Sequence, residues 1–407
     1  MRRRLAPVEQ EPSHPRDERW LTPPVRGIGA ASLLADAGHE IPTSLLPSFL
    51  TSTLGAPASA LGLIEGISDG LAGAARVGGG ALADDPRRRR ATAVSGYAST
   101  AVLSALIGGA STAWQAGILR AGAWASRGLR VPSRNALLAE AVPASAYGRA
   151  YGFERAMDNI GAIVGPLLAL ALLGLVGIRT AILLSVIPGL LAVAAIIYAI
   201  RNTAGRKDTV RQPIRLRVRP VLRGELGRLL GAIGVFEIGN VAATLLILRA
   251  TDLLEPGRSI DSAAQLAIGL YVLYNATAAV ASLPAGRVAD RATATLVLGG
   301  GIAAFAAAYA GFAFADGGLV LVPCFVAAGV GIAAVETAEH AAVAARAPDG
   351  LRGSSFGVLA GIQSFGNLVA SAVVGLLYTA VSSAAAFLFA GGAMVLALCA
   401  LAVAVRR

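Results

Sequence analysis

The chain has 407 residues, of which 55% are hydrophobic and only 14% are charged, and its formal net charge is +11. A soluble protein carries roughly 25% charged residues, so this composition excludes a soluble enzyme and indicates an all-α integral membrane protein. The arginines are scattered in short segments between apolar runs rather than gathered in one domain, which argues against nucleic acid as a partner.

Twelve apolar segments follow one another along the chain, and each is close to the ~20 residues that a helix needs to cross a bilayer. The six of the first half lie at about 27–51, 58–82, 91–112, 114–133, 154–177 and 180–201. Those of the second half lie at about 227–249, 264–285, 293–314, 317–340, 355–378 and 382–405. We therefore expect a tail over 1–26, a six-helix bundle over 27–201, a basic linker over 202–226 and a second six-helix bundle over 227–405.

The connections between these segments alternate in their content of lysine and arginine. The arginine-rich connections include 87–90 and the linker, whereas the other side holds only Arg179, Arg249 and Arg258. Positively charged loops stay in the cytoplasm. This pattern predicts a multi-pass membrane protein with both termini in the cytoplasm, and the resemblance described below implies a bacterial inner membrane.

The first apolar segment carries Asp36, His39 and Glu40 near its middle. On a helix these three positions share one face. A charge at the centre of the bilayer costs at least ~2.5 kcal/mol, so this face should point toward other helices around a polar interior. Intramembrane acids usually mark pathways or proton relays, and we expect Asp36 or Glu40, with His39 as a partner, to bind a coupling proton.

The two halves repeat each other. Gly80 and Asp84, after the second segment, match Gly286 and Asp290, after the eighth, 206 residues later. At an offset of 205, a second set of landmarks recurs, pairing Pro143, Gly148, Gly152 and Gly161 with Pro348, Gly353, Gly357 and Gly366. Parallel repeats of this kind, related by a pseudo-two-fold axis, place a substrate site between the halves near the midplane.

The loop from Gly80 to Arg90 resembles the G-x-L-A-D-R-x-G-R-R/K loop of the major facilitator superfamily. Asp84 and Arg88 match that pattern, whereas Asp85 replaces its basic residue and Arg87 its glycine. The copy from Gly286 to Arg291 keeps the G-x-x-A-D-R core. The resemblance implies a twelve-helix transporter with a cytoplasmic latch, in which Asp84 faces the N-terminal end of the eleventh segment and Arg88 pairs with acids at nearby helix ends.

Two further motifs narrow this resemblance. Gly161, Gly165 and Pro166 resemble the G-x-x-x-G-P signature of the family's antiporter branch. A narrower resemblance is to a bacterial efflux subgroup of the same family. It rests on the acids of the first segment, on Glu65 in LGLIEG and on the run from Arg127 to Arg134. That subgroup carries an acid–base pair where this chain has Ala123 and Trp124.

The remaining charged and polar residues within the segments give two groups of candidates. The expected substrate cavity comprises Glu65, Asp69, Arg120, Glu237, Asn240, Tyr271, Asn275, Gln363 and Asn367. The expected cytoplasmic gate comprises Gly80, Asp84, Arg88, Arg127, Arg130, Arg134, Gly286, Asp290, Arg291, Glu336 and Glu339. In the first half, four acids face four arginines, which suggests paired charges around a wet cavity.

The main functional hypothesis is export of a small organic molecule coupled to protons, by alternating access of the two bundles. An uptake carrier for an anionic metabolite, held by Arg120 and Arg127, is the alternative. Divalent-metal transport is less favoured because four arginines surround the acids, and a non-transporting receptor has no positive support. The sequence shows no nucleotide loop, nucleophile–base set or zinc spacing, so neither catalysis nor a cofactor is expected. Carriers of this type are usually complete as monomers.

Overall fold

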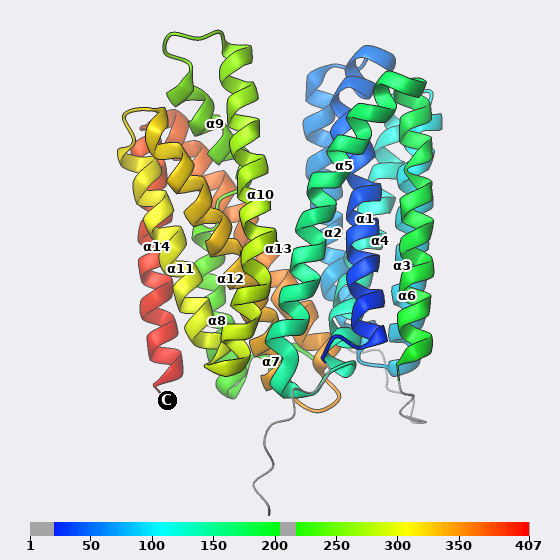
Figure 1. Cartoon of the computed structure of the whole chain (residues 1–407), viewed down its shortest axis with the longest axis vertical. Coiled ribbons are helices and arrows are strands. Elements are labelled where there is room, and N and C mark those ends of the chain that lie inside the picture. Colours follow the sequence, from blue (N-terminus) through cyan, green and yellow to red (C-terminus); the bar gives the residue numbers. More distant parts are fainter. Residues whose placement is uncertain (1–19, 204–216, 407) are drawn as a thin grey trace, which may run out of the picture.

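A computed structural model describes residues 20–203 and 217–406, and within these ranges the chain is helical without β-strands. The expected tail up to residue 19 and the linker from 204 to 216 lie outside the described residues. The helices form two groups that stand side by side (Figure 1). The first contains α1 (Pro23–Ser48), α2 (Ala58–Ala83), α3 (Pro86–Leu106), α4 (Ala113–Glu140), α5 (Tyr147–Leu184) and α6 (Val186–Asn202).

The second group begins with the single turn α7 (Val218–Val221) and continues with α8 (Gly224–Gly239), α9 (Ala243–Leu254), α10 (Ile260–Arg291), α11 (Ala294–Phe314), α12 (Leu321–Arg346), α13 (Arg352–Ala380) and α14 (Ser383–Val405). Its core is aromatic. Phe312 stacks on Phe387 with ring centroids 5.3 Å apart, and Phe236 packs against Phe305. The core of this group is therefore apolar away from the face that meets the first group.

Eight segments of the described chain are long and apolar enough to cross a membrane by length and composition, which indicates a multi-pass membrane protein. Helices α1, α2 and α4 are not among them. The reason lies in the sequence, because these three helices carry the charged residues expected to line a polar interior. Apolar side chains such as Leu175 and Leu319 are 80% and 94% exposed, as expected of a surface that contacts lipid.

Two interruptions of the helices shape the molecule. Gly177 lies inside α5 with φ 76° and ψ 166°, at the boundary expected between the fifth and sixth segments. A positive φ suits glycine because it has no Cβ. The second interruption was not evident from the sequence. The expected segment 227–249 divides into α8 and α9, and residues 240–242 between them are not helical, with Asn240 at ψ 91° and Ala242 at ψ 138°.

The two groups touch mainly where α10 lies along α5 and α13 lies along α2. On α2, a Cβ added to Gly80 would lie 2.8 Å from the Gly353 carbonyl oxygen, and one on Gly73 would lie 3.1 Å from Ser364. A Cβ on Gly70 would meet nothing within 4 Å. The groups therefore close toward the end of the molecule where α2 ends at Asp84, which we call the Asp84 end. The opposite end, where α5 passes into α6 (Figure 1), is called the Gly177 end.

Candidate functional site

A cavity of about 840 Å³ lies between the two groups of helices. Ligand pockets are typically ~300–1,000 Å³, so its size suits a small molecule. The first group supplies every arginine of its lining together with two acids: Arg76, Arg127, Arg130, Arg134, Arg155, Asp69 and Asp158. The second group supplies carboxyl, amide and imidazole groups: Glu237, Asn240, Glu336, Glu339, His340, Gln363 and Asn367. One wall is thus predominantly basic and the other acidic.

Asp36 and His39, which are buried, form a cluster with the half-buried Glu40 behind the basic wall. His39 is 3% exposed, its Nδ1 lies 3.3 Å from Asp36 Oδ1, and its Nε2 lies 3.3 Å from Glu40 Oε1. Nδ1 also lies 3.1 Å from the Ala35 carbonyl oxygen. Arg127 Nη2 lies 3.4 Å from Asp36 Oδ1. Because Arg127 lines the cavity and Asp36 does not, this arginine connects the cluster to the cavity.

The glycines of the antiporter-like motif hold α5 against this cluster. A Cβ on Gly161 would lie 2.9 Å from Asp36 Cβ, and one on Gly165 would lie 2.4 Å from Glu40 Cβ. Both contacts are too close for any side chain larger than hydrogen. The small-xxx-small spacing therefore lets α5 pack directly on the acidic face of α1, and Pro166 follows within α5.

Arg120 turns away from the cavity, contrary to the expectation from the sequence. It is 1% exposed, and its Nη2 lies 3.0 Å from Glu65 Oε1 while its Nη1 donates to the Thr43 hydroxyl at 2.9 Å. Its guanidinium also stacks on Trp124, 3.4 Å from the ring centroid, and the indole N–H donates to Asp69 at 2.9 Å. Arg120 and Glu65 therefore compensate each other's charge inside the first group.

Of the nine expected cavity residues, five line the cavity: Asp69, Glu237, Asn240, Gln363 and Asn367. Besides Arg120 and Glu65, the residues outside the lining are Tyr271, which stacks on Tyr274, and Asn275, which donates to the Tyr271 carbonyl. The contacts of the latter two are with residues of their own helix, α10. Trp124 and Arg76 belong to the lining, although the sequence analysis did not place them among its candidates.

A second buried charge network lies at the floor of the cavity. Glu154 is fully buried, and its carboxylate lies 2.8 Å from Arg134 and 2.7 Å from Arg155. Arg155 reaches across to Glu336 of the other group at 3.6 Å. Sequence analysis did not select Glu154, although its position directly before Arg155 was a usable signal. A buried charge persists only when it is paired, and Glu154 supplies that pairing for two arginines.

The acids of the second group have amide partners. Asn240 Nδ2 donates to Glu237 at 3.0 Å, and Gln363 donates to Glu339. Glu237 is 3% exposed and stands one turn before the break between α8 and α9. At that break the Val241 N–H donates to the Tyr309 hydroxyl at 3.1 Å, so a side chain of α11 supports the non-helical backbone.

The expected gate residues divide between two places. Arg127, Arg130, Arg134, Glu336 and Glu339 line the cavity rather than its closed end. The glycines and aspartates at the C-terminal ends of α2 and α10 instead form contacts between the groups at the Asp84 end. This division follows from the length of α4 and α12, which continue about two turns past the expected segments. The five charged residues therefore lie well before the ends of these helices and border the cavity.

Two latches related by the repeat close the Asp84 end. Asp84 accepts hydrogen bonds from the Ser354 N–H at 2.9 Å and from the Ser354 hydroxyl, at the start of α13. Asp290 accepts from the Gly148 N–H at 2.6 Å and from Arg149 at the start of α5. Each aspartate thus meets the positive N-terminal end of a helix in the other group, the contact that the loop motif implied for Asp84.

The residues around the first latch differ from the family's loop and compensate locally. Asp85 caps α3 by accepting from the Arg87 N–H at 2.9 Å, and Arg88 Nε lies 3.8 Å from Asp85. Arg89 is buried, donates to the Ala83 carbonyl at 2.6 Å and pairs with Glu140. Arg291 is exposed at the end of α10. Arg89, which sequence analysis did not select, is therefore the buried cation of this loop.

No group of three or more histidine, cysteine or acidic side chains within the described ranges is arranged to hold a metal ion. The arrangement instead offers a polar cavity, a buried acid–imidazole cluster behind it, and latches at one end. These parts can bind a small solute, hold a proton and close one side of the molecule.

A family model described as Major Facilitator Superfamily matches residues 28–253 and 241–407. An MFS-type transporter of Methanocaldococcus jannaschii is 25% identical over 371 residues, covering 89% of this chain and 90% of the relative. A protein of Mycobacterium tuberculosis is 32% identical over 177 residues, 43% of each chain.

Solved structures show the same fold at low sequence identity. The human organic anion transporter TETRAN superposes with a TM-score of 0.72 at 15% identity, covering 95% of this chain and all of that one. A bacterial homologue of the iron transporter ferroportin, in its outward-facing state, gives 0.72 at 17% identity with 94% of this chain covered and all of that one. The Escherichia coli fucose:proton symporter gives 0.71 at 15%, covering 94% and 98%.

Proposed function

The chain belongs to the major facilitator superfamily, whose members are membrane transporters and not enzymes, and on this premise we propose that it exports a small organic molecule in exchange for protons. The observation that carries the proposal is the polar cavity between the two helix groups, closed at one end by two matching latches. Such a cavity, with walls from both repeats, is the site that alternating access requires.

We further propose twelve membrane crossings in two bundles, 27–201 and 227–405, working as a monomer in the lipid bilayer. Helices α1, α2 and α4 complete the count because their charges pair with one another, as Glu65 does with Arg120, instead of facing lipid. The part of α5 after Gly177 joins α6 in one crossing, and α8 joins α9 in another. The crossing formed by α8 and α9 is broken at residues 240–242, and we call it the broken crossing. Its non-helical backbone borders the cavity, which is a setting where non-helical backbone is tolerated within a membrane.

The Asp84 end is assigned to the cytoplasmic side of the inner membrane. It holds the arginine-rich connection 87–90 together with Arg287, Arg291, Arg346 and Arg352, and positive loops remain inside. Both termini then lie in the cytoplasm. With this orientation the conformation described here has its cytoplasmic side closed, and it is the state in which an exporter releases its substrate to the other side and takes up protons.

Proton coupling is assigned to Asp36 and Glu40 with His39 between them. A proton on Asp36 cancels the charge that holds Arg127 at 3.4 Å, so the cavity wall becomes more positive. A cationic substrate then loses affinity, and proton and substrate compete as exchange requires. The same change favours an anionic substrate, which would travel together with the proton.

The charge of the substrate therefore separates export by exchange from the second candidate, uptake of an anionic metabolite. The basic wall of the cavity favours that candidate, with Arg76 and Arg127 in place of Arg120 as the residues that meet the anion. Arg127→Gln should then abolish anion uptake, whereas the matched Arg90→Gln, at the Asp84 end and outside the cavity lining, should retain it. Divalent-metal transport and a non-transporting receptor have less support.

The test uses purified protein in liposomes loaded with the pH dye pyranine. Tetraphenylphosphonium serves as the cationic probe, proline as the zwitterion and citrate as the anion, each radiolabelled and added with an imposed pH gradient. Exchange predicts that a cation or neutral probe moves against the proton flux. The double variant Asp36→Asn with Glu40→Gln should lose gradient-driven movement, and Glu255→Gln, exposed at the end of α9, should keep it. Undiminished transport by the double variant would overturn the coupling role.

A further inference from the structure

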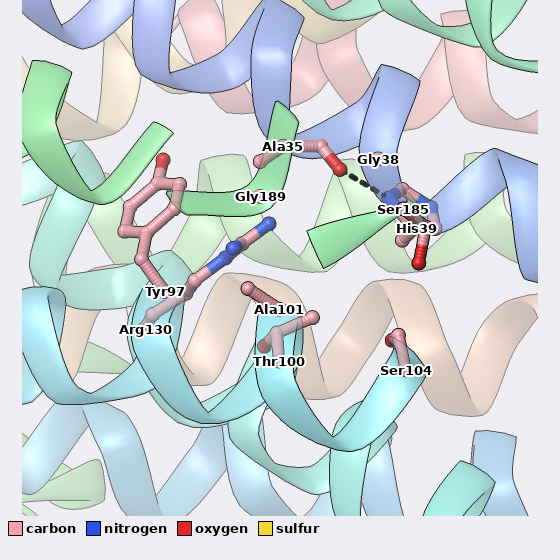
Figure 2. Close-up of a pocket in the computed structure, with 10 residues that line it drawn as sticks. All are labelled: Ala35, Gly38, His39, Tyr97, Thr100, Ala101, Ser104, Arg130, Ser185 and Gly189. Atoms are coloured by element: carbon pink, nitrogen blue, oxygen red, sulfur yellow. Dashed lines mark hydrogen bonds between the residues drawn. The ribbon is translucent and has the colours of Figure 1, made fainter. Parts of the chain in front are cut away.

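A second, much smaller cavity lies inside the first group of helices, between α1, α3, α4 and α6 (Figure 2). Its volume is about 10 Å³. The helices around it pack tightly, since a Cβ on Gly189 would lie 2.5 Å from Ala101 Cβ and one on Gly38 would lie 3.1 Å from the Gly189 nitrogen. The cavity is therefore a confined space within a well-packed bundle.

The walls of this cavity carry polar atoms that have no hydrogen-bond partner among the described residues. These atoms are Tyr97 Oη, Ser104 Oγ, Arg130 Nε and Ser185 Oγ. All four residues are at most 2% exposed. By contrast, Thr100 in the same wall donates to the Gly96 carbonyl at 2.7 Å. A buried polar group without a partner is rare in a native protein. The Tyr97 hydroxyl points away from the two serines (Figure 2), which leaves Arg130, Ser104 and Ser185 as the groups with a shared partner.

We propose that this cavity binds one ordered water molecule, which hydrogen-bonds Arg130, Ser104 and Ser185 and links the His39 cluster to the main cavity. A site for a single water needs about 10–15 Å³ and two to four polar partners. The donors and acceptors balance. The water oxygen accepts from the Arg130 Nε–H, and its two hydrogens are donated to the hydroxyl oxygens of Ser104 and Ser185.

The water lies beside the residues to which proton coupling is assigned, and its role in transport rests on that proposed function. His39 lines the small cavity, while Arg130 lines both the small cavity and the main one. The guanidinium of Arg130 also lies over the Tyr97 ring, 3.9 Å from its centroid. The water therefore lies in a space that both His39 and Arg130 border, beside the His39 cluster.

The charged and titratable groups around His39 come from several helices. On α1 they are Asp36 and Glu40; on α4, Arg127 and Arg130; on α3, Tyr97; and on α5, Asp158, which interacts with Asp36, while α6 contributes Ser185. Loss of the water changes none of these charges. A change in the pH dependence of transport after its displacement is therefore a signature of the water itself.

Hydroxyl-radical footprinting of the full chain tests for the water without any transport assay. Radicals generated from a bound water oxidise the side chains next to it. Tyr97 should be oxidised several-fold faster than Tyr151 and Tyr309, which are equally buried but do not border the small cavity. Equal rates for the three tyrosines would overturn the water site.

Two serine variants test the link to His39. Ser104→Val replaces the hydroxyl by two methyl groups, which also fill the space of the water, and Ser104→Ala serves if that variant does not fold. Either should slow oxidation of Tyr97 and shift the pH at which proton-driven transport is half-maximal. Ser95→Val, whose hydroxyl faces away on α3 and is exposed, is the matched control. Slower oxidation with an unchanged pH profile would overturn the link, while a wild type that footprints as expected but transports nothing would contradict only the proposed function.

Discussion

Asp84 at the end of α2 accepts two hydrogen bonds from Ser354 at the start of α13, one from its backbone N–H at 2.9 Å and one from its hydroxyl. The two residues lie 270 positions apart in the chain and belong to different helix groups. Asp290 forms the equivalent contact with α5. The repeat thus produces two similar latches on one end of the molecule, and both must break for that end to open.

Replacing Asp84 by alanine should open the Asp84 end. The change leaves the N–H and hydroxyl of Ser354 without their acceptor, which costs ~1–3 kcal/mol. Since 1.4 kcal/mol is a factor of ten, we expect the ratio of closed to open molecules to fall about tenfold. Distances between spin labels at Arg87→Cys and Arg287→Cys, both exposed, in a Cys399→Ser background would report the shift.

Asp85→Ala is the matched control for that measurement. Asp85 is as buried as Asp84 but caps α3 within its own group. It should lower thermal stability without changing the label distances. Equal opening by both variants would mean that the loop as a whole, rather than the contact with Ser354, keeps the end closed.

The same latch predicts a dependence on pH. Burial raises the pKa of the Asp84 carboxyl, although hydrogen bonds from Ser354 and the nearby Arg89 oppose the rise. Opening exposes Asp84 to water and returns its pKa toward ~3.9. Closing therefore takes up protons, so the closed population should be largest at acidic pH and should fall as the pH rises through the raised pKa.

Spin-label distances recorded across a pH titration would measure this dependence. Asp84→Asn resembles the protonated acid in shape and charge, so it should stay closed and flatten the titration. A closed population that grows as the pH rises would contradict the assignment of the effect to Asp84.

The motif glycines of α5 predict a large effect of one methyl group. Gly165→Ala places a Cβ 2.4 Å from Glu40 Cβ and 3.0 Å from the Ala37 carbonyl oxygen. Overpacking of this kind costs ~1–3 kcal/mol, so the melting temperature in detergent should fall by several degrees. Gly174→Ala on the same helix meets nothing within 4 Å and should not lower it. Equal melting of both variants would contradict the close contact between α1 and α5.

The broken crossing predicts a role for one hydroxyl. Tyr309→Phe removes the acceptor of the Val241 N–H and leaves that buried donor unpaired, at a cost of ~1–3 kcal/mol. Its thermal stability should fall measurably. Tyr198→Phe, at a tyrosine that is 51% exposed on α6, should be close to neutral. If Tyr309→Phe is neutral too, the break does not depend on this hydrogen bond.

The sequence by itself determined the elements and their repeat. Apolar segments of membrane-spanning length located the helices, and the matching Gly80–Asp84 and Gly286–Asp290 loops indicated where the halves would touch. These features are local, because length, hydropathy and turn chemistry act through near neighbours in the chain. The contact of Asp84 with the start of α13 was implied by the resemblance of the loop from Gly80 to Arg90 to that of the major facilitator superfamily.

Only the tertiary structure decided which way each charge points. Arg120 and Arg127 lie on one face of α4, yet Arg120 turns inward to Glu65 and Trp124, whereas Arg127 borders both Asp36 and the cavity. The break after Glu237 and the unpaired atoms around the small cavity were equally invisible in the sequence. Long side chains choose among partners on other helices, and a hydrogen bond such as that of Tyr309 is available only after those helices have packed. Sequence therefore sets the register of each charged face, and packing selects its partners.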